Sequence, residues 1–271
     1  MAVNKFILVL AYALTSSCQY SPWETDIDCQ DSYTSNLEEL RKIESNMTGD
    51  AFGVALIADI HIDLTDAVNV IDRIKQRDDV AFVIVLGDMT RYGLATEYEW
   101  VCKAMSSLDV PRFYVIGNHD SISFGKEIFR ENFAPYDYEF TFKDVKFILY
   151  NDNAYEFKDV PDYDFLSNAA LIQGGETRRL TLAVSHAPPV KGAHTEEEVA
   201  IIRQFLFEQG IDLTLHGDKH VFDHWIDEFG VPHHITGRVR NSKYGMLFID
   251  EFDQISIQSC APTCTETLTV N

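Results

Sequence analysis

The chain has 271 residues, 46% of them hydrophobic, which is enough to bury one large α/β core. Its formal net charge of −21 at pH 7 makes a nucleic-acid partner unlikely, because nucleic-acid-binding proteins gain most of their affinity from Lys and Arg side chains that neutralise phosphates. A small anionic substrate is compatible with this charge, since bound divalent cations dominate the field inside a local site.

The first residues predict export. Lys5 precedes an apolar stretch over residues 6–14, which is too short to span a bilayer. Residues 14–18 resemble a bacterial lipoprotein cleavage site, although Thr15 occupies a position that is usually aliphatic. We expect a lipoprotein-like signal peptide over residues 1–17 and a lipidated Cys18, which would anchor the protein to a membrane on the periplasmic or outer face. An ordinary signal peptide and a soluble periplasmic or secreted protein are the alternative.

Lipidation of Cys18 would leave four of the five cysteines, and an oxidising compartment permits disulfides among them. Cys102 lies in a helical pattern and is expected to be a buried free thiol. Cys29, Cys260 and Cys264 lie near the two ends of the mature chain, so a bridge that ties the ends together is left open. A zinc site at Cys260 and Cys264 is discounted, because the chain has no second cysteine pair to complete it.

Residues 18–50 are expected to form a spacer with a short helix at about 37–43, followed by one domain over residues 51–271. In that domain the apolar runs 52–58 and 81–86 predict buried strands, and a third follows at 113–116. Helical patterns separate these runs. The alternation is the βαβ pattern of an α/β fold.

Three helices follow from the pattern of apolar residues and start signals. The first begins at Thr65 and is expected to bury Val68, Ile71 and Ile74. Capping boxes at Thr96–Glu99 and Thr195–Glu198 predict the starts of the other two. The residues expected to face inward from the second are Trp100, Val101, Ala104, Met105 and Leu108. Residues 138–150 predict a hairpin, and strand-like stretches follow over 221–259.

Five short polar blocks carry the functional signal, and almost all directly follow an apolar run. They are Asp59-Ile60-His61, Gly87-Asp88, Gly117-Asn118-His119-Asp120, Ser185-His186 and Gly217-Asp218-Lys219-His220. Open α/β sheets bind ligands outside the carboxyl ends of their strands, so the blocks should converge on one edge. Their mixed oxygen and nitrogen donors suit iron, manganese or zinc better than calcium, and Asp88 could bridge two such metals.

The blocks D-I-H, G-D-M-T, G-N-H-D, S-H-A-P-P and G-D-K-H resemble the signature of the calcineurin-like metallophosphoesterases, and the resemblance covers residues 51 to about 258. Residues 87–93 are most similar to bacterial class III phosphodiesterase-like members. The resemblance implies a four-layer α/β/β/α sandwich of two mixed β-sheets flanked by helices.

The resemblance also implies two divalent or trivalent metal ions (Mn, Fe or Zn) and a function, hydrolysis of a phosphomonoester or phosphodiester by a hydroxide that bridges them. The first metal would be held by Asp59, His61, Asp88 and His220. The second would be held by Asp88, Asn118, His186 and Asp218. His119 would protonate the leaving oxygen, with Asp120 as a further catalytic candidate. Arg91, Asn118 and His119 are the substrate-binding candidates.

Two positions depart from the family pattern. Asp218 replaces a histidine and would favour a harder metal, such as manganese or iron; His216 could substitute, although a structural role is expected for it. Arg91 replaces the aspartate of protein serine/threonine phosphatases, and it could bind phosphate or pair with a helix acid. The other histidines are expected to be structural, with His224, His233 and His234 offered as residues at the substrate entrance.

A second hypothesis follows from the Asp218 departure. A chain that has lost its second metal there would be a catalytically impaired metal-binding or scaffolding lipoprotein on the same fold. A nuclease is a third possibility, and the acidic charge opposes it.

Overall fold

Two mixed six-stranded sheets pack face to face between helices in the computed structural model, which describes residues 25–29, 31–261 and 263–270. The first sheet contains β1 (Phe52–Ile57), β2 (Val80–Val85), β3 (Arg112–Tyr114), β10 (Tyr244–Ile249), β11 (Ile255–Cys260) and β12 (Cys264–Val270). The second contains β4 (Tyr138–Phe142), β5 (Val145–Leu149), β6 (Leu180–Val184), β7 (Leu213–His216), β8 (Asp223–Ile226) and β9 (Pro232–Ile235). The helices are α2 (Tyr33–Asn46), α3 (Leu64–Ile74), α4 (Ala95–Met105), α5 (Gly125–Asn132), α6 (Tyr163–Ala170) and α7 (Glu196–Glu208), with a 3-10 turn, η2, at His119–Ser121.

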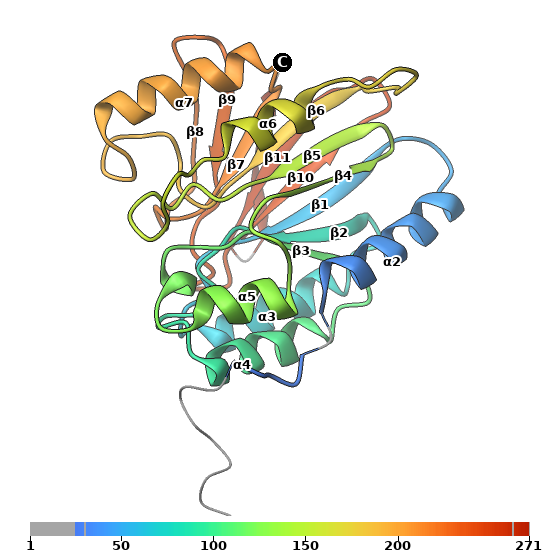
Figure 1. Ribbon diagram of the computed structural model, residues 1–271. Coiled ribbons are helices and arrows are strands. Elements are labelled where there is room, and N and C mark those ends of the chain that lie inside the picture. The colour runs from blue at the N-terminus through green and yellow to red at the C-terminus, as the bar shows by residue number, and fades with distance from the viewer. Residues whose placement is uncertain (1–24, 30, 262, 271) are drawn as a thin grey trace, which may run out of the picture.

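The layers confirm the expected α/β/β/α sandwich. Helices α3, α4 and α5 lie on the outer side of the first sheet, and α6 and α7 lie on the outer side of the second (Figure 1). The strand orders are β12-β11-β10-β1-β2-β3 and β4-β5-β6-β7-β9-β8. Strands β1, β2 and β3 run parallel, as do β5, β6, β7 and β9. Each sheet therefore brings several carboxyl ends to one edge.

The space between the sheets is filled by aromatic rings. Phe113 and Phe140 come from opposite sheets and stack with centroids 4.0 Å apart, while Phe82 meets Phe142 edge to face at 5.6 Å. All residues of β1 and β2 are buried, because these strands are covered on both faces. This continuous burial produces the unbroken apolar runs in the sequence and gives the strand ends a rigid base.

Two helices bury a somewhat different face from the one that the sequence predicted. Val68 is 41% exposed, and α3 instead buries Ala67 and Val70 together with Ile71 and Ile74. Helix α4 begins at Ala95, where the Glu97 carboxylate accepts a hydrogen bond from the Leu94 N–H, so the predicted Thr96–Glu99 box is wrong.

In α4 this start leaves Trp100 on the outer face, 58% exposed, although Val101 and Met105 are buried as expected. The Thr195–Glu198 capping box of α7 is confirmed, and so is the hairpin of β4 and β5, which turns at Lys143 and Asp144.

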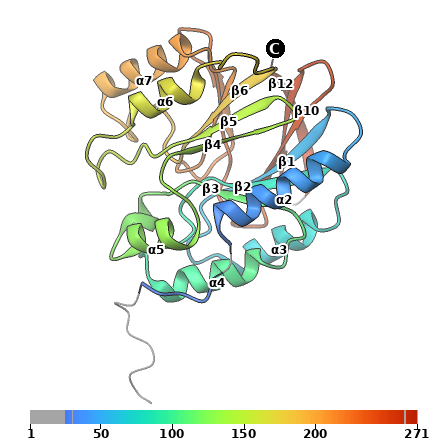
Figure 2. The same ribbon diagram turned by 45° about the vertical axis from the view of Figure 1, so that its right-hand side comes forward.

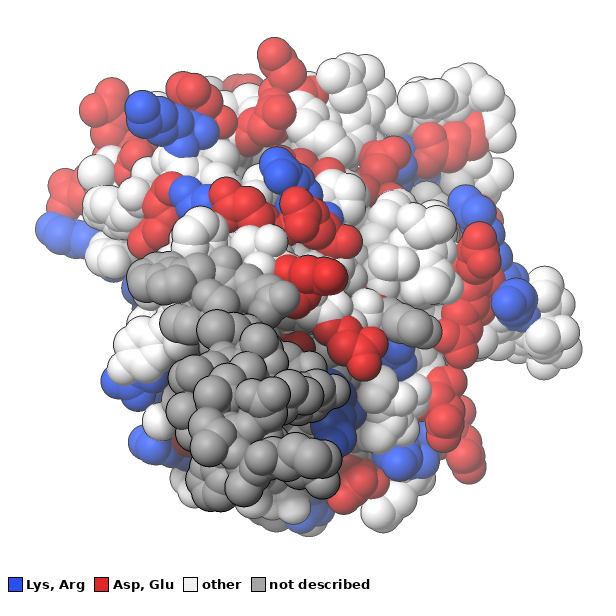
Figure 3. Space-filling view, turned by 60° about the horizontal axis from the view of Figure 1, so that its bottom comes forward, with Lys and Arg blue, Asp and Glu red and all other residues white. Residues whose placement is uncertain are grey.

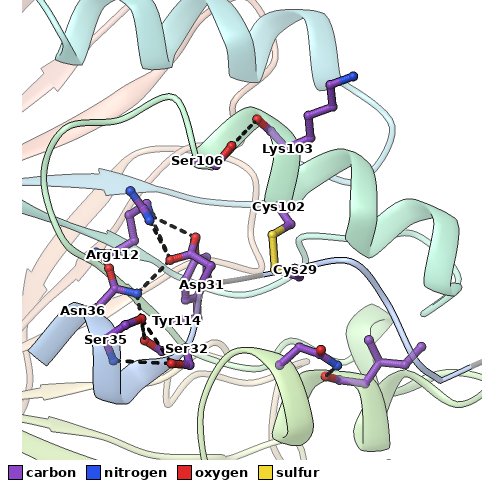
Figure 4. Close-up of a disulfide and its surroundings, with 12 residues drawn as sticks. Cys29, Asp31, Ser32, Ser35, Asn36, Cys102, Lys103, Ser106, Arg112 and Tyr114 are labelled. Atoms are coloured by element: carbon purple, nitrogen blue, oxygen red, sulfur yellow. Dashed lines mark hydrogen bonds and ion pairs between the residues drawn. A yellow bond between two sulfur atoms is a disulfide. The ribbon is translucent and has the colours of Figure 1, made fainter.

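The segment before β1 packs on the body of the domain. Helix α2 is longer than the predicted helix and lies beside β3 and β4, the edge strands of the two sheets, with Leu40 in the core (Figure 2). The Asp31 carboxylate accepts hydrogen bonds from the Arg112 guanidinium at 2.9 Å and from the Tyr114 hydroxyl (Figure 4). This buried ion pair fixes the start of α2 to β3.

The disulfide pairing contradicts the prediction for Cys102 and answers the question that the sequence left open for Cys260 and Cys264. Cys102 is not a free thiol; it is bonded to Cys29, which ties the N-terminal segment to α4 (Figure 4). Cys260 and Cys264 bond to each other across the turn between β11 and β12, so they do not join the two ends of the chain.

The predicted signal peptide, residues 1–17, and Cys18 lie outside the described residues. None of the helices in the described part of the chain is long and apolar enough to cross a bilayer.

Because loop-closure entropy grows with loop length, the two disulfides should differ in their effect on stability. Cys29–Cys102 spans 73 residues and Cys260–Cys264 spans 4. We expect Cys29→Ser to lower the free energy of unfolding, measured by urea denaturation, by about 2–4 kcal/mol and Cys264→Ser by about half as much. A loss from Cys264→Ser equal to or larger than that from Cys29→Ser would contradict this ranking.

Candidate metal centre

The five polar blocks converge at the carboxyl edges of the two sheets, as the sequence predicted. Asp59, Asp88 and Asn118 follow β1, β2 and β3, whereas His186 follows β6 and His220 follows β7. The candidate centre is therefore built by both sheets, at the junction between them.

Asp88 lies at the middle of this centre. One carboxylate oxygen, Oδ2, is 3.3 Å from His61 Nε2, and the other, Oδ1, is 3.4 Å from His186 Nε2. His186 Nε2 is also 3.2 Å from Asn118 Oδ1. A carboxylate placed between two such groups can reach two cations at once.

A second carboxylate, that of Asp59, is 3.7 Å from His220 Nε2. Three sets of donor atoms, each within 4.8 Å of one another, could hold a metal ion: Asp59 with His61 and His220, His61 with Asp88 and His119, and Asp59 with Asp88 and His186. The sets overlap through Asp59, His61 and Asp88. This overlap is the arrangement expected for two neighbouring cations.

The backbone at these positions is unusual. Five of the candidate ligands adopt a positive φ between 46° and 64°: Asp59, His61, Asp88, Asp218 and His220. Residues other than glycine seldom adopt this conformation, which costs of order 1–3 kcal/mol and is concentrated at functional sites. Its repetition at the ends of β1, β2 and β7 turns the side chains toward a common point.

Two of the block glycines are required by close approach. A Cβ on Gly87 would lie 2.4 Å from His186 Nδ1, and one on Gly117 would lie 2.2 Å from Asp88 Oδ1. Any larger residue would push a ligand out of place. The glycines of the sequence blocks therefore allow the ligand-bearing loops to pack against each other.

Hydrogen bonds orient the histidine rings. The Nδ1–H groups of His61, His119 and His186 face the carbonyl oxygens of Thr90, Arg91 and Leu86 at 3.1, 2.8 and 2.7 Å. A carbonyl can only accept, so these bonds place the proton on Nδ1 and leave the lone pair on Nε2. That tautomer suits a metal ligand, whose second nitrogen is usually held in this way.

The electrostatics of the centre fit a cation. Burial raises the pKa of Asp59 well above its usual value, and its Oδ2 atom is buried without a hydrogen-bond partner among the described residues. Burial also lowers the pKa of His61 to about 4, which keeps its ring neutral. A buried carboxylate oxygen without a donor is costly, and a bound metal ion would satisfy it.

Asp120 lies beneath the centre rather than in it. The side chain is fully buried, and its carboxylate accepts hydrogen bonds from the backbone N–H groups of Met89, Thr90 and Gly117 and from the Thr90 hydroxyl. These bonds tie the Asp88 loop to the Asn118 loop. The structure therefore places Asp120 as a positioning residue, not as a catalytic residue that contacts the substrate.

Asp218 and Arg91 depart from the family pattern; the Asp218 side chain lies at the centre, whereas Arg91 contacts it through its backbone carbonyl. The Asp218 Oδ1 atom is 3.9 Å from His186 Nε2, and its backbone N–H donates to Asp59 Oδ1 at 3.2 Å. The Arg91 carbonyl holds His119, while its guanidinium stacks 5.5 Å from the Tyr92 ring centroid. The ligand role of Asp218 and the phosphate-binding role of Arg91 stay predictions.

Three of the remaining histidines, His216, His233 and His234, are buried. His216 is fully buried between the hydroxyls of Ser185 and Thr214, at 3.0 and 2.7 Å, as expected for a structural residue. His233 and His234 are buried in β9, so the expectation that they line a substrate entrance is wrong.

The sequence analysis missed a further polar segment at the centre. Asp152 and Asn153 follow β5 and line a pocket together with Asn118 and Asp218. The signal was present, because Asn151-Asp152-Asn153 comes just after an apolar run, as the other blocks do.

Asp120→Asn tests the positioning role. The amide nitrogen of asparagine cannot accept the N–H bonds, so we expect the free energy of unfolding of the metal-free protein to fall by about 1–3 kcal/mol. The exposed Asp164→Asn is the matched control. Equal urea denaturation curves for the two variants would show that the carboxylate does not hold the loops together.

Comparison with known proteins agrees with the geometry. The dimetal phosphatase from Danio rerio shares 14% identity and a TM-score of 0.59, over 81% of this chain and 98% of that one. A purple acid phosphatase from yellow lupin shares 11% identity and a TM-score of 0.64, over 82% of this chain and 54% of that one. GAP50 of Plasmodium is described as the anchor in the inner membrane complex. It shares 14% identity and a TM-score of 0.63, over 82% of this chain and 89% of that one.

These likenesses show the fold. No curated protein matches the sequence. The sequence profile of the calcineurin-like phosphoesterases matches residues 52–222, which contain all five blocks, and the chain therefore belongs to the calcineurin-like phosphoesterase family.

Proposed function

We propose that this protein hydrolyses a phosphomonoester or phosphodiester with the help of two metal ions. The observation that carries the proposal is the set of overlapping donor clusters around Asp88, with His119 beside them. Family membership supports a phosphoesterase, and the donor chemistry supports metal binding.

Each metal position would use residues from more than one strand end. Asp59, His61, Asp88 and His220 would hold one ion, and Asp88, Asn118, His186 and Asp218 would hold the other. Manganese, iron and zinc all suit this mixture of carboxylate, imidazole and amide donors. When bound, the two ions would supply Lewis acidity to the phosphate oxygens and a nucleophilic water at neutral pH.

His119 is suited to protonate the leaving oxygen. Its Nδ1–H is held by the Arg91 carbonyl at 2.8 Å, its backbone N–H donates to Asp88 Oδ1 at 2.9 Å, and its ring centroid is 4.7 Å from that of His61. The Nε2 atom is thus the nitrogen left to exchange a proton with the substrate, and it can act as an acid when it carries a proton. This placement supports the role of general acid.

The proposal includes a small substrate and an exported protein. The net charge of −21 supports a small phosphate ester rather than a nucleic acid as the substrate, and basic side chains are scattered among acidic ones over the described part of the face in Figure 3. The two disulfides support an oxidising compartment, as would follow from export. Anchoring through a lipidated Cys18 remains part of the proposal.

Asp88→Asn should abolish turnover. For comparison, we expect the manganese-loaded wild-type protein to hydrolyse para-nitrophenyl phosphate or its bis ester and to contain two metals per chain. Because Asp88 reaches both positions, the variant should lose at least about a hundredfold in kcat and at least one metal, measured by elemental analysis. Asp164→Asn is the matched control, and wild-type activity in Asp88→Asn would overturn the bridging assignment.

His119→Ala should be most harmful for poor leaving groups. Without the general acid, kcat for phenyl phosphate should fall by about 10²–10³-fold, and that for 2,4-dinitrophenyl phosphate, whose alcohol leaves without a proton, by about tenfold or less. Metal content should be unchanged. A uniform loss across both substrates would remove His119 from the acid role.

The rival hypothesis is a catalytically impaired metal-binding or scaffolding protein. It is favoured by Asp218 in place of histidine and by the likeness to GAP50, which its description names an anchor. One metal per chain and no hydrolysis of either nitrophenyl ester would support this rival.

A further inference from the structure

An apolar pocket opens directly beside the candidate metal centre. Its volume is about 310 Å³, and it lies between α4 and the segment that runs from the loop after β1 to the start of α3. The lining residues are His61, Ile62, Leu64, Glu97, Trp100 and Val101. His61 belongs both to this pocket and to the metal-ligating set, so the pocket adjoins the candidate centre.

Two large apolar side chains are exposed at this pocket. Trp100 is 58% exposed and Ile62 is 57% exposed, although α4 has a well-buried inner face that includes Tyr98 and Met105. Neither side chain is therefore needed to complete the core. A tryptophan on the rim of a site supplies a rigid surface on which an apolar or aromatic group can pack.

The acid in the pocket is already engaged. The Glu97 carboxylate accepts hydrogen bonds from the backbone N–H groups of Tyr92 and Leu94, at 2.9 and 3.2 Å. It caps the start of α4 and is not free to attract a cationic ligand. What the pocket offers an incoming group is apolar contact.

The space on the opposite side of the centre has another character. It measures about 110 Å³, and its lining mixes polar and acidic residues, among them Asp152, Asn153, Glu156 and Asp218, with the small apolar side chains of Ala154, Ala187 and Ala193. An apolar group there would lie against carboxylates and amides, in a space about a third as large as the pocket beside His61. An apolar part of a substrate therefore fits better on the His61 side.

We infer that this protein acts on phosphate esters of apolar alcohols, and that the pocket formed by Ile62, Leu64, Trp100 and Val101 binds the alcohol. The inference rests on the proposed function. The His119 ring is 4.7 Å from that of His61, which lines the pocket, and we take the group in the pocket to be the one that leaves with the proton. A volume of about 310 Å³ is at the small end for ligand pockets and admits one ring system or a short alkyl chain.

Phosphonates test the pocket without requiring turnover, because their P–C bond is not hydrolysed. We expect hexylphosphonate to bind the manganese-loaded protein at least about tenfold more tightly than methylphosphonate by calorimetry, since each buried methylene contributes about fourfold. Trp100→Ala should reduce this ratio to about threefold or less. Phe252→Ala, which removes an exposed ring on the loop between β10 and β11, is the matched control and should keep the wild-type ratio.

The outcomes separate this inference from the proposed function. Nitrophenyl phosphate hydrolysis with equal phosphonate affinities would overturn the pocket and leave the enzyme. Tight, Trp100-dependent hexylphosphonate binding without any hydrolysis would support the pocket while the proposed function fails. Equal phosphonate affinities combined with Trp100-dependent binding to phosphatidylcholine vesicles would overturn the inference and assign Trp100 to membrane contact.

Discussion

The candidate centre depends on the buried carboxylate of Asp88, which faces His61 on one side and His186 on the other. These histidines come from different sheets, so the interaction joins the two halves of the sandwich at their carboxyl edges. Burial works against the ionised form of Asp88, but electrostatic interaction with the nearby histidines, His186 above all, lowers the pKa of Asp88. A carboxylate that is ionised inside a protein requires compensating positive charge. A cation bound beside Asp88 would supply that charge.

Much of the surrounding structure serves to hold this carboxylate in place. The loop that carries it is tied to the Asn118 loop by Asp120, and Gly87 and Gly117 let His186 and the Asp88 loop approach. The positive φ of Asp88 itself adds backbone strain. Such strain persists only where surrounding contacts over-determine the conformation, which the covered strands β1 and β2 provide.

The sequence predicted the strands, the sandwich and the convergence of the five blocks, because continuous apolar runs and strand-end ligands are local patterns. The predictions from the sequence were wrong where contacts between distant segments determine which side chains are buried or paired. Trp100 was expected to be buried, but the start of α4 is set by Glu97, and the ring points outward. Cys102 pairs with a cysteine 73 positions away in sequence, a contact that helical periodicity cannot reveal.

For the site, the sequence identified the donors but not their surroundings. The buried role of Asp120 depends on three backbone N–H groups from two loops, and the buried positions of His233 and His234 depend on β9 pairing with β7 and β8. The pocket beside His61 combines a loop after β1 with a helix after β2. Each of these features arises from packing between segments that are distant along the chain.

We have proposed that two metal ions bind around Asp88. Anomalous diffraction from crystals of the manganese-loaded protein tests this proposal most directly. We expect two peaks about 3.5–4 Å apart, both in contact with the Asp88 carboxylate, one nearer His61 and His220 and the other nearer Asn118 and His186. A single peak, or none at this edge of the sheets, would contradict it.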